Sequence, residues 1–184
     1  MNWGRLYTHI LKFYGKFSQK FFIFHPLPPI HIFYLCTKEC NLDCEFCITR
    51  GIKRINFEPS IKSHKVIINQ TPRFSLLSFC GGEPLMMENF IEIFEYAASK
   101  RKVSVMTNAT LINDSIARNL IIKGARHFLS NGLIGIDVSV HGIGNTHDKL
   151  VGKQGAFSLT VNGIEKLIHY KKKLKKKFPI INLR

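Results

Sequence analysis

The chain has 184 residues, of which 45% are hydrophobic and 11% aromatic, which is enough apolar material for the core of one ordinary domain. This composition excludes intrinsic disorder as the main state of the chain. Lysine and arginine number 27 against 12 acidic residues, so the formal net charge is +15. Such a basic balance permits nucleic acid, anionic lipid or an acidic peptide as a partner but specifies none of them.

Two features of the sequence bear on where the protein is expected to work: its apolar runs and its crowded cysteines. No stretch reaches the roughly 18–20 uninterrupted apolar residues of a membrane-spanning helix, and the N-terminus lacks the apolar run and cleavage site of a signal peptide. Four of the five cysteines lie between Cys36 and Cys47. Thiols crowded in this way suit a metal site in a reducing compartment better than disulfides. We therefore expect a cytoplasmic protein.

Residues 1–24 have the clearest helical pattern, with basic residues on one side and a regular apolar face on the other. The apolar face consists of Trp3, Tyr7, Ile10, Tyr14, Phe17, Phe21 and Phe24. This spacing predicts an amphipathic helix, which a proline-rich link ending at Pro29 stops. The aromatic face packs on the protein or a partner chain, or else lies on a membrane surface. We expect residues 1–29 to form this helix and linker, and residues 30–184 to form the main domain.

From residue 30 onward, short β-type runs alternate with helical periods. The predicted strands cover residues 30–35, 74–79, 103–107, 134–140 and 179–183. One predicted helix has the stripe Phe90, Ile93, Phe94 and Ala97, a second begins at the cap Asn113 and ends near Gly124, and a third carries Val161, Ile164, Leu167, Ile168 and Leu174. Residues 51–71 show no clean helical period. The alternation predicts parallel strands joined by right-handed crossovers, hence an α/β sheet or barrel.

In the fourth predicted strand, Ile136 and Val138 alternate with Asp137 and Ser139. One face of the strand should therefore meet the helices and the other a polar interior. Six lysines between Lys171 and Lys177 should end the third helix as a solvated terminus. An RNA or acidic-partner patch is the alternative, but no aromatic residue is interleaved to stack on bases, so we do not expect nucleic acid as a partner.

The strongest chemical signal is the run from Cys40 to Cys47, CNLDCEFC, which places Cys40, Cys44 and Cys47 directly after the first strand. Thiolates are soft ligands that select zinc or iron-sulfur clusters. Three of them on a four-iron cluster leave one iron open to a substrate or cofactor. With Cys36 the set becomes four cysteines, which could close a structural zinc site. Both interpretations remain open on the cysteines alone.

Further motifs follow the later strands, and together they resemble the radical SAM superfamily. The cluster loop of that family is C-x3-C-x2-C with an aromatic residue before the last cysteine, as Phe46 is here. Residues 81–84, GGEP, match another of its motifs, and residues 107–111, TNATL, are similar to its TNGTL segment. Residues 139–142, SVHG, stand where many members have S-x-D-G. The resemblance runs from about residue 30 to the end of the chain.

The resemblance implies a set of cofactors and the residues that bind them. Cys40, Cys44 and Cys47 would hold a [4Fe-4S] cluster, whose free iron would chelate S-adenosylmethionine (SAM). Reductive cleavage of SAM would give a 5′-deoxyadenosyl radical that abstracts hydrogen from a substrate. An external reductant such as flavodoxin or ferredoxin is implied. The implied cofactor-binding residues are Gly81, Gly82, Glu83, Pro84, Asn108 and Ser139.

The roles within this set differ. Gly81 and Gly82 would leave room for close backbone approach to the ligand, and polar groups around Glu83 would hold the methionine ammonium of SAM. No side chain is singled out as a catalytic acid, base or nucleophile. The stretch from His147 to Phe157 is similar to members that modify peptides or mature other enzymes, so a peptide or a small molecule is the expected substrate. We expect the histidines outside the SVHG segment, including His147, on the surface or at helix caps.

Family members have a core that resembles an incomplete TIM barrel of six βα units. The expected fold class is therefore α/β, a partial TIM-like barrel with four to five of those units. The sequence has His141 where an acid is usual, and Val151 near the place where many members carry an arginine that meets the SAM carboxylate. The chain stops inside what looks like the fifth strand, so we expect a fragment of a longer protein. Two alternatives remain: a zinc-stabilised module of four cysteines that contacts nucleic acid, and a truncated chain that binds the cluster without turnover.

Overall fold

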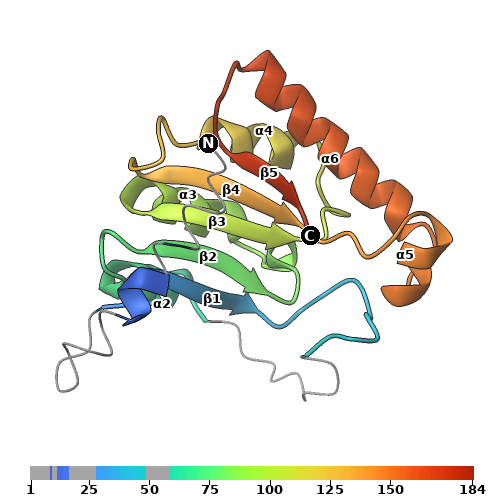
Figure 1. Ribbon diagram of the computed structural model, residues 1–184, viewed down its shortest axis with the longest axis horizontal. Coiled ribbons are helices and arrows are strands. Elements are labelled where there is room, and N and C mark those ends of the chain that lie inside the picture. Colours follow the sequence, from blue (N-terminus) through green and yellow to red (C-terminus); the bar gives the residue numbers. More distant parts are fainter. Residues whose placement is uncertain (1–8, 10–11, 17–27, 49–58) are drawn as a thin grey trace. The chain divides into compact units, whose positions relative to one another are not determined.

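The computed structural model describes residues 9, 12–16, 28–48 and 59–184 (Figure 1). The chain divides into two compact units, Met1–Ile30 and His31–Arg184. In the first unit, residues 12–16 are helical, and the Tyr14 hydroxyl donates a hydrogen bond to the Pro28 carbonyl. Most of the helix predicted over residues 1–24, and part of the proline-rich link, lie outside the described residues.

The second unit is a parallel sheet with helices in its crossovers (Figure 1). Its strands are β1 (His31–Thr37), β2 (Leu76–Gly81), β3 (Lys102–Thr107), β4 (Gly132–Val138) and β5 (Ile180–Leu183), paired in that order. Its helices are α2 (Ile61–Gln70), the 3₁₀ turn η1 (Pro84–Met86), α3 (Phe90–Lys100), α4 (Asp114–Ile122), α5 (Asn145–Leu150) and α6 (Ala156–Lys173). Right-handed crossovers between strands in consecutive order place the helices on one face of the sheet. The predicted α/β class is confirmed, and the arrangement is that of a partial TIM-like barrel.

The core lies between the sheet and these helices. The predicted stripe of α3 is buried, with Phe90 3% and Phe94 0% exposed, and the Phe79 ring of β2 packs edge-on against both. In β4, Ile136 and Val138 are fully buried on the helical side, whereas Asp137 on the other face is only partly buried. The alternation predicted for this strand is confirmed.

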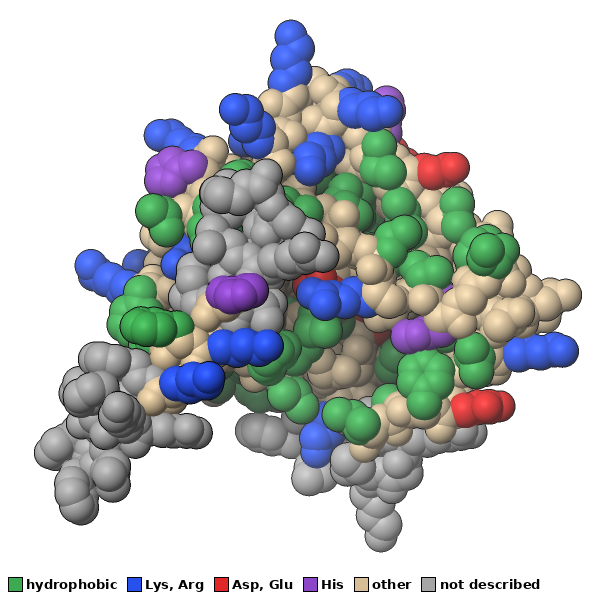
Figure 2. All heavy atoms as spheres, viewed as in Figure 1, with side chains coloured by type: hydrophobic (Ala, Val, Ile, Leu, Met, Phe, Trp, Pro, Cys, Tyr) green, Lys and Arg blue, Asp and Glu red, His purple; other side chains and the backbone are tan. Residues whose placement is uncertain are grey.

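The second and third predicted helices are also present. Asn113 caps α4, accepting a hydrogen bond from the Ile116 amide at 2.9 Å, and this helix ends just before Gly124. Helix α6 ends in the lysine run, where Lys175 adopts φ +50°. The Lys175 amide donates to the Lys172 carbonyl and the Lys176 amide to the Lys171 carbonyl, which is the Schellman pattern of a helix C-terminus. Figure 2 shows Lys and Arg side chains gathered at this end of the molecule.

Two helices were missed by the sequence pattern. Helix α2 lies in the stretch that shows no helical period, because only His64 and Ile68 of its residues are buried, while Val66 and Ile67 are exposed. Helix α5 has six residues, too few for a period to show. Among the residues that the structure describes, no helix combines the length and the apolar character needed to cross a membrane.

Candidate active site

The loop that follows β1 carries the three spaced cysteines, and we refer to residues 38–48 as the thiol loop. It crosses the turn that follows β2: the Gly82 amide donates to the Thr37 carbonyl at 2.8 Å, and the Glu83 amide to the Glu39 carbonyl at 2.7 Å. A Cβ atom on Gly82 would lie 2.1 Å from the Glu39 carbonyl oxygen, and one on Gly81 would lie 2.3 Å from that of Thr37. These two glycines therefore make room for the chain's own backbone.

A second set of contacts joins the thiol loop to the end of α5. The Asp43 amide donates to the Val151 carbonyl at 3.0 Å, and the Glu45 amide to the Leu150 carbonyl at 3.1 Å. Gly152 has φ +68°, and a Cβ atom there would lie 2.7 Å from the Asp43 carbonyl oxygen. The backbone of Val151 thus supports the thiol loop.

A third set of contacts ties the thiol loop to the turn after β3. The Asn108 side-chain amide donates to Asn41 Oδ1 at 2.9 Å, and the Asn41 amide donates to the Thr110 hydroxyl at 2.8 Å. Asn108 Oδ1 in turn accepts from the Thr110 amide and hydroxyl. The sequence analysis singled out Asn108 but missed Asn41. An amide directly beside Cys40 was the available signal, since Asn can satisfy two backbone or side-chain partners at once.

Glu83 joins two of the motifs through its buried carboxylate. It is 1% exposed and accepts hydrogen bonds from the Thr107 hydroxyl at 2.7 Å, the Asn108 amide at 2.8 Å and the Leu85 amide at 3.1 Å. Burial raises the pKa of Glu83, while these hydrogen bonds act to lower it. Three donors thus occupy the carboxylate, which fixes the ends of β2 and β3 relative to each other.

The three thiols of the loop interact electrostatically. Burial raises the pKa of Cys40, and the charges of Glu83 and Cys47 raise it further. Burial also raises the pKa of Cys44, followed by the charges of Cys40 and Cys47. Cys44 is half-buried and Cys47 exposed. The pKa of Cys40 and that of Cys44 thus both respond to the charge of Cys47.

Cys36 has different surroundings. It is 4% exposed in the hydrophobic core, and its Sγ donates to the Cys80 carbonyl at 3.3 Å. Burial raises its pKa to about 12, with the charges of Cys80 and Glu83 adding to the effect. The Cys36 thiol thus lies in the core and is not presented with the thiols of the thiol loop.

The donors of the thiol loop are cysteine thiols, which as thiolates suit zinc and iron-sulfur clusters alike. In the described part of the chain, no three His, Cys, Asp or Glu side chains stand close enough to hold one metal ion. Four thiolates around one zinc must each lie about 2.3 Å from it, whereas a four-iron cluster gives each cysteine its own iron and spreads the thiols apart. The thiol loop offers three thiols and Cys36 lies apart from them in the core, so the residues fit a centre with three cysteine ligands.

A row of aromatic side chains in contact with one another extends from the thiol loop to α6. The Phe46 ring contacts His141 with centroids 4.5 Å apart, His141 stacks on His147 at 6.0 Å, and His147 contacts Phe157 at 5.8 Å. His147 is fully buried, so its expected place on the surface or at a helix cap was wrong. Its Nδ1 accepts from the His141 amide, its Nε2 has no hydrogen-bond partner among the described residues, and burial lowers its pKa.

Ser139 completes the set of predicted residues. It directly follows β4, is half-buried, and its amide donates to the Thr107 carbonyl at 3.0 Å. The structure therefore brings the thiol loop, the GGEP turn, Asn108 and Ser139 to the carboxyl ends of β1 to β4. This is the edge at which parallel α/β folds bind ligands and carry out chemistry.

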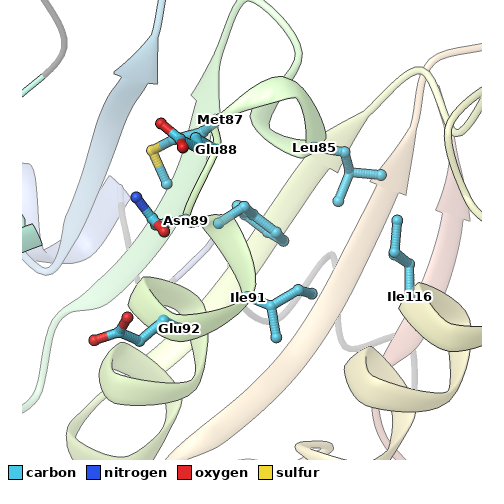
Figure 3. Close-up of a pocket in the computed structure, with 8 residues that line it drawn as sticks. Leu85, Met87, Glu88, Asn89, Ile91, Glu92 and Ile116 are labelled. Carbon is cyan, nitrogen blue, oxygen red and sulfur yellow. The ribbon is translucent and has the colours of Figure 1, made fainter.

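Two hollows lie away from these residues. One, of about 390 Å³, lies between η1, the start of α3 and α4, where the side chains of Leu85, Ile91 and Ile116 face a shared space (Figure 3). The other, of about 610 Å³, lies between α6 and β5, with Ile164 and Ile181 in its lining and lysines such as Lys172 on its rim. None of the predicted site residues lines either hollow.

Comparison with known proteins decides the family. The family model of the Radical SAM superfamily matches residues 34–181. The chain belongs to the Radical SAM superfamily. Members of this superfamily are enzymes that use a [4Fe-4S] cluster and SAM.

Named relatives carry out several kinds of reaction. The chain is 32% identical over 133 residues to the Fe-coproporphyrin III synthase of Methanosarcina barkeri, covering 70% of this chain and 31% of that protein. It is 27% identical over 142 residues to the sporulation killing factor maturation protein SkfB of Bacillus subtilis, covering 76% and 33%. The chain thus spans about a third of the length of these relatives.

Solved structures share the fold. Streptococcus suis SuiB has a TM-score of 0.62 at 20% identity, covering 85% of this chain and 32% of SuiB. The structure of anSMEcpe with AdoMet and the Kp18Cys peptide has a TM-score of 0.62 at 22% identity, covering 85% and 43%. These similarities agree with the partial-barrel architecture of the second unit.

Proposed function

We propose that this chain provides the cluster-binding and SAM-binding part of a radical SAM enzyme that modifies a peptide or protein. The observation that carries the proposal is the thiol loop itself. It carries Cys40, Cys44 and Cys47 on one short segment, and it is tied to the turns after β2 and β3 and to the end of α5. A loop held on three sides is a preorganised ligand set, which a catalytic centre requires.

Each predicted residue has a role in this proposal. Cys40, Cys44 and Cys47 would hold the [4Fe-4S] cluster, and the turn Gly81, Gly82, Glu83 and Pro84, together with Asn108 and Ser139, would line the SAM site. Bound there, cluster and SAM would supply the one-electron chemistry that yields a 5′-deoxyadenosyl radical for hydrogen abstraction. The protein's own part is to fix the loop through Glu83 and its neighbours. The core side chains Phe79 and Val105, each 0% exposed, keep the sheet beneath the site closed to water.

The substrate class rests on the relatives. SkfB is named a maturation protein, MftC of Mycolicibacterium smegmatis a mycofactocin maturase, and SuiB has been crystallised with its precursor peptide. These names favour a peptide substrate, while relatives such as a probable GTP 3′,8-cyclase keep a small molecule as the alternative. An external one-electron donor such as flavodoxin or ferredoxin completes the proposal.

The test is anaerobic reconstitution with iron and sulfide, followed by EPR of the reduced protein with and without SAM. Three forms are compared: wild type, Cys44→Ala, and the matched variant Cys36→Ala. We expect a cubane-type signal that changes on adding SAM in wild type and Cys36→Ala, and that is lost in Cys44→Ala. Formation of 5′-deoxyadenosine under reducing conditions then distinguishes turnover from cluster binding alone.

Other outcomes would overturn the proposal in defined ways. Stoichiometric zinc without iron or sulfide, lost equally on changing Cys36 or Cys44, would support the zinc module of four cysteines. A cluster that responds to SAM but never yields 5′-deoxyadenosine would support a chain that binds the cofactors without turnover.

A further inference from the structure

We infer that Asn41 is a positioning residue that locks the thiol loop onto the turn after β3 and so fixes the cluster ligands against the SAM site. The inference rests on the proposed function for the identity of that site. Its structural content, an amide clasp between two loops far apart in the sequence, stands on the contacts of the described residues alone.

The clasp uses both ends of the Asn41 side chain. Its Oδ1 accepts from Asn108 Nδ2 at 2.9 Å, and its Nδ2 donates to Thr110 Oγ1 at 2.8 Å. The Thr110 hydroxyl donates to Asn108 Oδ1 at 2.7 Å, so the three side chains form a closed ring of hydrogen bonds. In a closed ring each group acts as donor and acceptor at once, which makes such networks cooperative.

Asn108 is itself firmly held. It is 8% exposed, its amide nitrogen donates to Glu83 Oε2 at 2.8 Å, and its carbonyl oxygen accepts from the Thr160 hydroxyl of α6 at 2.9 Å. The partner of Asn41 is therefore anchored to two other elements. Because Asn108 is held in this way, its hydrogen bond to Asn41 restricts the movement of the thiol loop.

Asn41 lies in the part of the thiol loop that the backbone hydrogen bonds leave unsupported. Backbone hydrogen bonds hold the loop at Glu39 on one side and at Asp43 and Glu45 on the other. Asn41 lies between these points, directly after Cys40. Its clasp therefore constrains the segment that carries the first cluster ligand of the proposed site.

The first experiment uses the full chain without cluster. Hydrogen-deuterium exchange is measured on wild type, Asn41→Ala and the control Asn113→Ala, which removes the exposed cap of α4. Loss of a clasp of this kind should speed exchange of residues 38–48 and 107–111 by roughly 5- to 30-fold. The control should instead speed exchange at the start of α4 and leave the thiol loop unchanged.

The second experiment separates the clasp from general destabilisation. Thr110→Val removes the acceptor of the Asn41 amide, whereas Thr110→Ser keeps the hydroxyl. We expect Thr110→Val to reproduce the faster exchange of Asn41→Ala, Thr110→Ser to resemble wild type, and the double variant Asn41→Ala with Thr110→Val to show no further increase, because the two residues belong to one network.

The third readout uses reconstituted protein. We expect Asn41→Ala to lose iron to a chelator roughly tenfold faster than wild type and to show a smaller EPR change on adding SAM, while Asn113→Ala matches wild type. Unchanged exchange and unchanged cluster retention in Asn41→Ala would overturn the inference. If wild type assembles no cluster, the proposed function fails, but the exchange data still decide whether the clasp exists.

Discussion

The backbone of Asp43 is paired with that of Val151: the Asp43 amide nitrogen lies 3.0 Å from the Val151 carbonyl oxygen, although most of the sheet separates the two residues in sequence. Gly152 follows directly and leaves the space into which the Asp43 carbonyl fits. This pairing connects the thiol loop to the end of α5, and it yields the first prediction.

Gly152→Ala should loosen the thiol loop. An alanine there combines a left-handed backbone, at a cost of about 1–2 kcal/mol, with a Cβ atom 2.7 Å from the Asp43 carbonyl oxygen. We expect roughly tenfold faster amide exchange in residues 38–48. Gly155→Ala is the matched control, because its φ of +79° imposes a similar backbone cost but no atom lies within 4 Å of the new Cβ. Equal loop exchange in the two variants would contradict the prediction.

Lys175→Gly should stabilise the protein. Lys175 occupies the left-handed position of the Schellman pattern at the end of α6, with φ +50°, and its side chain is exposed. Glycine adopts this conformation without the steric cost, so we expect a gain of about 0.5–1 kcal/mol in the free energy of unfolding and a rise in Tm of about 1–4 °C. Lys175→Ala removes the same charge without relieving the backbone. Thermal unfolding should rank glycine above both lysine and alanine, and an equal gain from alanine would attribute the effect to charge.

Glu83→Gln should destabilise the chain strongly. The carboxylate accepts three hydrogen bonds in a buried site, and an amide would point its NH₂ group at one of those donors. We expect a loss of about 2–4 kcal/mol in the free energy of unfolding by urea. The control Glu92→Gln breaks the exposed ion pair with Lys65 and should cost less than about 1 kcal/mol. Similar losses in both variants would show that the Glu83 hydrogen bonds contribute little.

Glu83→Gln should also change how the free energy of unfolding depends on pH. Burial raises the pKa of Glu83 above its usual 4.5, so between that value and the higher pKa of the folded state the native chain binds more protons than the unfolded one. The contribution of Glu83 to the free energy of unfolding is therefore fully present below pH 4.5. It is lost as the pH rises through the pKa of Glu83 in the folded state. We expect the stability difference between wild type and Glu83→Gln to shrink as the pH is raised. A difference that grows with pH would mean that the hydrogen bonds outweigh burial.

Cys36 should be the slowest thiol to react in the reduced, cluster-free protein. With a pKa of about 12, its thiolate fraction at pH 8 is about one in ten thousand, and its 4% exposure restricts access further. Its labelling by iodoacetamide should rise about tenfold for each pH unit between about pH 7 and pH 9. Cys47, which is exposed, should be labelled first. Peptide mass spectrometry measures the order, and early labelling of Cys36 would contradict its place in the core.

The sequence allowed much of the sheet to be predicted, because each strand is a short apolar run with turn residues around it. In β4, the alternation of Ile136 and Val138 with Asp137 was enough to orient the strand. The stripe of α3 and the cap of α4 followed from spacing and from Asn113. Helix α2 was not predicted, because only two of its residues are buried and its sequence therefore shows no apolar stripe.

The sequence singled out candidate residues for the site but did not predict their contacts. Cysteine spacing and the GGEP turn marked the loops, yet the register of the sheet decides that Asn41 meets Asn108. Nothing in the sequence distinguishes the buried His147 from a surface histidine. Gly81 and Gly82 were expected to let the backbone approach a ligand closely, whereas the group that fills the space beside them is the backbone of Thr37 and Glu39.

The contacts of the thiol loop also set an order of events during biosynthesis. The loop follows β1 and so is synthesised early, but its partners come from the turns after β2 and β3 and finally from Leu150 and Val151. Closing such long intervals costs chain entropy that is recovered only when the later strands have paired. The three cysteines therefore leave the ribosome before they acquire their final arrangement, and under the proposed function cluster assembly would follow folding of the sheet through α5.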